Sequence, residues 1–135
     1  MELQVGVKVL LENEEGKYLL LRRSAKKYPE TGEQWDMVGG RIDPGTTLME
    51  NLAREVDEES GLSLEGSPRL VAAQDILRVP GRHVVRLTYL GRASGELKLS
   101  EEHDAYRWFS LAEIEADEKG DPYLKEILAQ GVFGD

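Results

Sequence analysis

The chain has no cysteine, which excludes disulfides and thiolate metal sites and gives no sign of an oxidising compartment. It also has no apolar run of membrane-spanning length. The N-terminal segment MELQVGVKVLLENEE has no basic region before its short apolar stretch, as a secretion signal would. From these absences we expect a soluble, cytoplasmic protein.

Basic charge is scarce as well. The chain has 17 Lys and Arg against 26 Asp and Glu, a formal net charge of −9. This balance argues against a general affinity for nucleic acid or anionic lipid, because such binding depends on basic charge. A small phosphorylated ligand is compatible with this negative net charge, since bound divalent cations and a few local arginines can reverse the field inside one cleft.

With 135 residues, of which 40% are hydrophobic, the chain is long enough for one core and too short for two ordinary domains. We therefore expect a single domain over residues 1–135. Apolar and alternating runs predict a hairpin of two strands, Val5 to Leu11 and Lys17 to Arg23, and later strands at Arg69 to Val79, His83 to Leu90 and Ala105 to Phe109. Residues 63–68 are expected to be a connector. Two helices should follow, from Leu111 to about Asp117 and from Tyr123 to Gln130, before a tail whose Phe133 can dock on the body or on a partner subunit. Periodicity alone indicates α+β or α/β.

The stretch GGRIDPGTTLMENLAREVDEESGL is the most informative one. It predicts a glycine loop that leads into a short acidic helix from Leu48 to Ser60. Thr47 and Glu50 have the spacing of a capping box, and Gly61 stands where a helix needs a left-handed residue to end.

Three carboxylates of this helix, Glu55, Glu58 and Glu59, share one arc when each residue turns the helix by about 100°. That arc overlaps the edge of the apolar face. Carboxylates gathered there repel one another and lose hydration, and bound cations remove this cost. The pattern predicts a Mg²⁺ or Mn²⁺ site, with Arg54, beside Glu58 and one turn after Glu50, holding a carboxylate in place. The alternatives are a solvated helix face and a partner-binding surface with no small ligand.

The same stretch resembles the Nudix box. The residues that occupy the positions fixed in that family are Gly40, Arg54, Glu55, Val56, Glu58, Glu59, Gly61 and Leu62. Gly39 completes the frequent glycine pair. One position departs, because Thr46 stands where the family has Glu, and this bears on the rate and the number of metals more than on the reaction class.

The resemblance implies a Nudix-type α/β/α sandwich around a mixed β-sheet. It also implies a metal-dependent pyrophosphohydrolase that cleaves a nucleoside diphosphate linked to another moiety, such as a nucleoside triphosphate or a dinucleotide-type substrate, to phosphate monoesters. Its Mg²⁺ or Mn²⁺ would be held by Glu55, Glu58, Glu59 and the carbonyl of Gly39. A nucleotide-sugar hydrolase is the alternative within the enzyme class, and a catalytically weakened nucleotide-binding sensor is the alternative that Thr46 keeps open. Homodimers are common in such families.

A second informative stretch is LKLSEEHDAYRWFSL. By the same resemblance, Glu102 is the candidate for an extra metal ligand or the general base, and Glu101 is its substitute. A solvated loop is the alternative. His103 belongs to a type suited to proton transfer, although a lone loop histidine is more often just exposed. Trp108 is expected in the core.

Four residues are candidates for substrate binding. Arg22 and Arg23 end a strand before the polar loop of residues 24–34, where they predict either a phosphate clamp facing the helix carboxylates or solubilising edge charge. Arg41 follows the glycine pair, either near the diphosphate or on plain surface. Trp35 is either an aromatic wall for a nucleobase or, as the better alternative, a core anchor.

Overall fold

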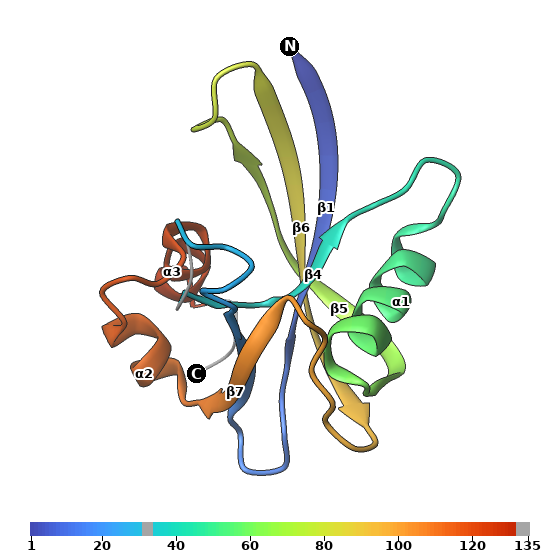
Figure 1. The fold of residues 1–135 in the computed structure, drawn as a ribbon, viewed down its shortest axis with the longest axis vertical. Helices are drawn as coiled ribbons and strands as arrows, with labels where there is room; N and C mark the ends of the chain where they lie inside the picture. Colours follow the sequence, from blue (N-terminus) through green and yellow to red (C-terminus); the bar gives the residue numbers. More distant parts are fainter. Residues whose placement is uncertain (31–33, 132–135) are drawn as a thin grey trace.

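Seven strands and three helices make up the part of the chain, residues 1–30 and 34–131, that the computed structural model describes. In chain order they are β1 (Glu2–Leu11), β2 (Tyr18–Arg23), β3 (Trp35–Asp36), β4 (Val38–Arg41), α1 (Leu48–Ser60), β5 (Ser63–Ile76), β6 (Arg82–Ser94), β7 (His103–Phe109), α2 (Leu111–Ala116) and α3 (Pro122–Ala129). The strands lie between α1 on one side and α2 and α3 on the other (Figure 1). No helix in this part of the chain has both the length and the apolar character needed to cross a membrane.

The strands form two sheets, one ordered β4-β1-β6-β5 and the other β3-β2-β7. The first sheet is mixed, because β1 runs parallel to β6 and antiparallel to β4. The predicted α/β architecture with a mixed sheet is therefore confirmed. In the β1–β4 pair Lys8 lies opposite Gly39, so the glycine loop is fixed against the middle of a central strand.

The turn of the predicted β1–β2 hairpin is confirmed, but the predicted pairing of the two strands is wrong. The turn closes through a hydrogen bond of 2.9 Å from Asn13 N to Lys17 O and a bridge between Glu12 and Tyr18. Beyond it the strands diverge into different sheets. Because β4 and β6 pair with the two edges of β1, no edge is left for β2.

Strand β5 begins earlier than expected, so the prediction of a connector over residues 63–68 is wrong. The antiparallel β5–β6 ladder already starts at the pair Ser63–Ser94 and shifts register between Glu65 and Arg69. Such a bulge accepts Pro68, which has no N–H to give to the ladder. The turn between the two strands contains Gly81 in a left-handed conformation with φ of 80°.

Strand β2 lies between the two halves of the core. Leu19 and Leu21 belong to the cluster under α1, together with Leu52 and Val56 of that helix, whereas Leu20 belongs to the cluster on the side of α2 and α3. This double burial explains why β2 is a continuous apolar run rather than an alternating one. Trp108 is partly buried and packs against the first cluster. Its predicted place in the core thus holds for the part of the side chain that packs there.

The two C-terminal helices start at defined caps. Ser110 caps α2 with a complete capping box, and Asp121 caps α3 through a 2.9 Å bond that its Oδ1 accepts from Tyr123 N. Both helices lie within about a residue of the predicted ranges. Phe133 and residues 31–33 of the polar loop lie outside the described residues.

Candidate active site

Helix α1 has the predicted boundaries, Leu48–Ser60. Thr47 Oγ1 accepts a hydrogen bond of 3.1 Å from Glu50 N, and its hydroxyl donates to Glu50 Oε1 at 2.9 Å. The glutamate therefore bonds the cap side chain rather than the cap backbone, a variation on the predicted capping box. At the other end Gly61 has φ of 73° and donates its N–H to Asp57 O. Capped at both ends, the helix holds its carboxylates in fixed directions.

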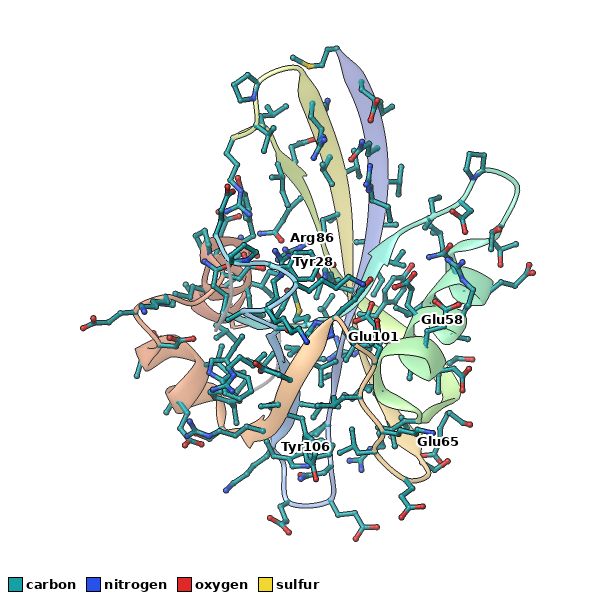
Figure 2. The ribbon with its side chains drawn as sticks, in the orientation of Figure 1. Tyr28, Glu58, Glu65, Arg86, Glu101 and Tyr106 are labelled. Atoms are coloured by element: carbon teal, nitrogen blue, oxygen red, sulfur yellow. The ribbon has the colours of Figure 1, made fainter. Side chains whose placement is uncertain are left out.

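These carboxylates line one cavity, which we call the acidic cleft. Its volume is about 360 Å³, and its lining residues are Lys27, Glu55, Glu58, Glu59, Ser100, Glu101 and Glu102. The structure thus brings the three predicted helix carboxylates together with both predicted loop glutamates. Glu58 on α1 and Glu101 on the segment before β7 are labelled in Figure 2. Lys27, from the loop after β2, is a lining residue that the sequence did not single out.

Glu59 is the buried member of the cleft, with 6% of its surface exposed. Its Oε1 accepts a hydrogen bond of 3.4 Å from Gly39 N. Burial, and next a hydrogen bond with Glu55, raise the pKa of Glu59 from an ordinary 4.5 to about 9, while the charge of Lys8 works in the opposite direction. At neutral pH without metal, Glu59 therefore carries a proton where two carboxyl groups meet.

The two glycines before α1 leave space for this arrangement. A Cβ on Gly39 would lie 2.0 Å from Val7 O, and its φ is 140°, so no larger residue fits there. A Cβ on Gly40 would lie 2.8 Å from Glu55 Oε2. Gly39 thus permits the close approach of two strands, and Gly40 permits the position of Glu55.

Lys8 is a site residue that the sequence analysis missed. Its Nζ donates to the carbonyl oxygens of Gly39 and Met37, each at 3.3 Å, and lies 3.4 Å from Asp36 Oδ2. The carbonyl proposed as a metal ligand thus has a cation beside it. A lone lysine inside an otherwise apolar strand was the signal available in the sequence.

The acidic side chains that line the cleft are all carboxylates, which Mg²⁺ and Mn²⁺ prefer as ligands. Within residues 1–30 and 34–131, no three His, Cys, Asp or Glu side chains already stand as a coordinating group. The meeting of the Glu59 and Glu55 carboxyl groups, which raises the pKa of Glu59, nevertheless fits a divalent cation. Positive charge there would replace the proton and draw the carboxylates inward.

Among the described residues, Arg54 pairs with Asp43 and Glu55, and not with the helix neighbours Glu50 and Glu58 that its spacing suggested. Its Nη1 lies 2.9 Å from Asp43 Oδ2, and its Nη2 lies 3.4 Å from Glu55 Oε1. Its contact with Glu55 is compatible with the expectation that it holds a carboxylate, which stays a prediction. Asp43 comes from the loop before the helix, which folds back toward it.

Asn51 joins that loop to α1 and was not recognised as a site residue. It is fully buried, its Oδ1 accepts bonds from Asp43 N at 3.1 Å and Arg54 Nη2 at 2.8 Å, and its Nδ2 donates to Arg41 O at 3.3 Å. The signal in the sequence was a polar residue close to the apolar face of the helix.

The two arginines at the end of β2 are not among the lining residues of the acidic cleft. Arg22 Nε lies 2.8 Å from Asp104 Oδ1, and its guanidinium is 5.9 Å from the centre of the Trp35 ring. Arg23 lies 3.4 Å from Asp36 and stands over the ring of Tyr28. Both arginines thus contact loop and strand residues, and their role as a phosphate clamp stays a prediction.

Trp35 packs on the core and also lines a second cavity. Its ring meets that of Phe109 edge to face at 5.2 Å, and Trp35 is one of the lining residues of that cavity. Its role as a wall for a nucleobase stays a prediction. Arg41 is exposed and lines a separate surface cavity with Asp43 and Pro44, so its proximity to a diphosphate stays a prediction.

The second cavity, which we call the basic cavity, has a volume of about 150 Å³. Its charged lining residues include Lys8, Arg23, Asp36, Arg78, Arg86 and Asp121. Burial by itself would raise the pKa of Asp36, yet the charges of Lys8, Arg23 and Arg86 outweigh burial and hold this pKa below its ordinary value. Asp36 is therefore a carboxylate balanced by cations.

His103 differs from the exposed loop histidine that was expected. It begins β7, only 8% of its surface is exposed, and burial lowers its pKa. Its Nδ1 is buried and has no hydrogen-bond partner among the residues that the structure describes. The ring is thus a packed, neutral group next to Glu102 in the chain.

Comparisons with known proteins agree with this geometry. The model of the NUDIX domain matches residues 2–131. The 8-oxo-dGDP phosphatase NUDT18 of Homo sapiens is 39% identical over 64% of this chain, which spans only 25% of that protein's length. The asymmetrical bis(5'-nucleosyl)-tetraphosphatase of Mus musculus is 31% identical over 76% of this chain and 70% of its own.

Solved structures show the same fold. A MutT protein from Methanosarcina mazei Go1 has a TM-score of 0.82 with 31% identity, over 95% of this chain and 91% of its own. The ORF135 protein of E. coli has a TM-score of 0.79 with 26% identity, over 96% and 88%. With the family model spanning nearly the whole chain and the three glutamates of the box lining one acidic cleft, this chain belongs to the Nudix hydrolase family.

Proposed function

We propose that the acidic cleft hydrolyses a nucleoside diphosphate linked to another moiety, with a bound divalent metal ion, to give two phosphate-containing products. The observation that carries this proposal is the meeting of Glu55, Glu58 and Glu59 with Glu102 in one cavity. A cleft of carboxylates alone would repel a diphosphate, so the substrate enters together with neutralising cations.

Glu55, Glu58, Glu59 and the carbonyl of Gly39 are the residues that would hold the metal. When bound, Mg²⁺ or Mn²⁺ supplies positive charge to the diphosphate oxygens and acidifies a water. Arg54 orients Glu55, which it contacts at 3.4 Å. Because Glu59 is protonated in the metal-free protein, loading the site requires it to release a proton.

A water then attacks one phosphorus in line, and the bond from that phosphorus to the bridging oxygen breaks. The leaving phosphate keeps the bridging oxygen, and the water's proton passes to a carboxylate of the cleft. Glu102 is our candidate for this base, with Glu101 as its substitute, since both face α1 across the cleft. Lys27 is placed to neutralise charge that develops on the phosphate oxygens.

A nucleoside polyphosphate is the substrate class that we favour. Two relatives support it by their names, an 8-oxo-dGDP phosphatase and a dinucleoside tetraphosphatase. A nucleotide sugar is the alternative substrate. A weakened nucleotide sensor is the alternative function, and Thr46, in place of the family's Glu, is the observation that favours it.

The test is a panel of nucleoside di- and triphosphates, oxidised forms included, dinucleoside tetraphosphates, ADP-ribose and nucleotide sugars, incubated with Mg²⁺ or with EDTA. Products are identified by mass. We expect cleavage of one nucleoside polyphosphate class with Mg²⁺ and none with EDTA. Cleavage confined to nucleotide sugars would select the alternative substrate, and tight binding without turnover would select the sensor.

Two further expectations belong to this proposal. A cytoplasmic location is consistent with the lack of cysteine. A homodimer is expected from the resemblance to the family, and sedimentation of the purified chain would test it.

A further inference from the structure

We propose that the basic cavity binds an anionic oxygen group of the substrate, a phosphoryl or a carboxylate group, and that Arg86 is the residue that recognises it. The inference rests on the proposed function, because it places a second anionic group on the substrate of that active site. The acidic cleft would handle the scissile diphosphate, and the basic cavity would select what the diphosphate carries.

Arg86 has an unsatisfied edge. Its side chain on β6 (labelled in Figure 2) is only 7% exposed, and its Nη1 lies 2.7 Å from Asp121 Oδ2. Its Nε and Nη2 are buried and have no hydrogen-bond partner among the described residues. Buried charged donors are costly to leave unpaired, so a ligand that accepts from both has free energy to gain.

The geometry of that edge selects the ligand. Nε–H and Nη2–H lie side by side on a guanidinium and point in nearly the same direction, which matches two oxygens of one carboxylate or phosphoryl group. The remaining guanidinium nitrogen, Nη1, is already paired with Asp121. A single acceptor atom would satisfy only half of the free edge.

The charges of the cavity favour an anion. Five cationic residues, Lys8, Arg23, Arg78, Arg86 and Lys119, line it against two acidic ones. Both acids are already engaged, Asp121 by Arg86 and by Tyr123 N, and Asp36 by Lys8 and Arg23 at 3.4 Å each. In a chain with a net charge of −9, this is a local excess of positive charge.

The position of the cavity connects it to the catalytic cleft. Lys8 lines the basic cavity and also donates to the carbonyl of Gly39, whose N–H donates to Glu59 in the acidic cleft. The side chain of Lys8 and the backbone of Gly39 thus connect the basic cavity to the acidic cleft. At about 150 Å³ against about 360 Å³, the basic cavity has the smaller volume, which suits a terminal group.

Binding can be tested without catalysis, by NMR on ¹⁵N-labelled protein in EDTA, where the acidic cleft holds no metal. Sodium phosphate, sodium acetate and guanosine are titrated at constant ionic strength set with sodium chloride. We expect a saturable shift of the Arg86 Nε–H resonance with phosphate, with acetate or with both, and the pattern identifies phosphoryl or carboxylate as the preferred group. A shift with guanosine alone, or with none of the three, would overturn the proposal.

Variants then assign the effect. Arg86→Gln with Asp121→Asn removes the ion pair as a unit and keeps a helix cap, since Asn also caps helices well. We expect the dissociation constant of phosphate or acetate to rise about tenfold or more, as the loss of charge-assisted hydrogen bonds implies. Arg82→Gln is the matched control, because Arg82 is exposed on the same strand and does not line the cavity. Equal weakening by both changes would mean non-specific attraction and would contradict the proposal.

Steady-state kinetics distinguish a failure of this proposal from a failure of the proposed function. For a substrate with an anionic group beyond the diphosphate, the Arg86→Gln, Asp121→Asn variant should raise KM and leave kcat within about twofold, as expected when ground-state and transition-state binding are lost equally. An absence of turnover in the wild type would refute the proposed function while leaving the NMR result intact. An unchanged KM in the variant would refute only the role of the cavity in binding substrate.

Discussion

Arg54 Nη1 lies 2.9 Å from Asp43 Oδ2, so the loop that carries Thr46 still supplies a carboxylate to the arginine of the box. The amide of Thr46 donates to Asp43 O at 3.0 Å, which closes the turn that presents this carboxylate. We expect this carboxylate to offset the absence of a Glu at residue 46 by keeping the arginine oriented toward Glu55.

Asp43→Asn should therefore lower kcat about tenfold, because residues that orient metal ligands commonly matter at that scale. The free energy of unfolding should change by less than about 1 kcal/mol, since the pair is 40% and 61% exposed. Steady-state kinetics and urea unfolding measure the two effects. Adding Thr46→Glu to the variant should restore most of kcat. A fully active Asp43→Asn variant would show that the pair has no part in catalysis.

Substitutions at the two glycines before α1 should have different effects, Gly40→Ala on catalysis and Gly39→Ala on stability. Gly40→Ala places a Cβ 2.8 Å from Glu55 Oε2, so the carboxylate must move and kcat should fall about tenfold or more while the fold persists. Gly39→Ala meets the backbone at 2.0 Å with φ of 140° and should cost more than about 2 kcal/mol of stability.

Gly45→Ala is the control for these two variants. Gly45 has φ of 89° but nothing within 4 Å of a Cβ, so only conformational strain, about 1 kcal/mol, is expected. Urea unfolding compares the three variants. Equal losses for Gly39→Ala and Gly45→Ala would contradict the close approach of β4 to β1.

The raised pKa of Glu59 predicts the pH dependence of stability without metal. Because the folded-state pKa of about 9 exceeds the ordinary 4.5, the folded state binds the extra proton between these values, and stability falls as pH rises through that window. His103 acts in the opposite direction near its ordinary value of 6.5, since its pKa is lowered on folding. The range from pH 7 to 9 therefore isolates Glu59.

Urea unfolding in EDTA at several values of pH measures this effect. The wild type should lose stability from pH 7 to 9, and Glu59→Gln should show a shallower slope. Glu58→Gln is the control, because Glu58 is exposed in the same cleft. Parallel slopes for the wild type and Glu59→Gln would contradict the buried, protonated carboxyl.

The parts of the site that the sequence predicts are those determined by neighbours along the chain. The limits of α1 follow from Thr47 and Gly61, and the common arc of Glu55, Glu58 and Glu59 follows from helical periodicity. These features depend only on backbone geometry within a few residues.

The parts that it misses depend on pairing between distant segments. Lys8 reaches the site because β1 pairs with β4, and Arg86 on β6 pairs with Asp121, the cap of α3, across 35 residues of sequence. The expected pairing of β1 with β2 failed for the same reason, since strands later in the chain occupy the edges of β1. Local strand signals contain no information about which edges will be taken.

The most direct test of the central claim is the rate of Mg²⁺-dependent hydrolysis of the best substrate of the panel by the wild type and by the Glu58→Gln, Glu59→Gln variant. A Glu115→Gln, Glu118→Gln variant is the matched control, because it removes the same charge from exposed positions at and after α2. We predict that the cleft variant loses at least about a hundredfold in kcat and that the control keeps the wild-type rate. Equal Mg²⁺-dependent rates in all three proteins would contradict the assignment of the acidic cleft as the catalytic site.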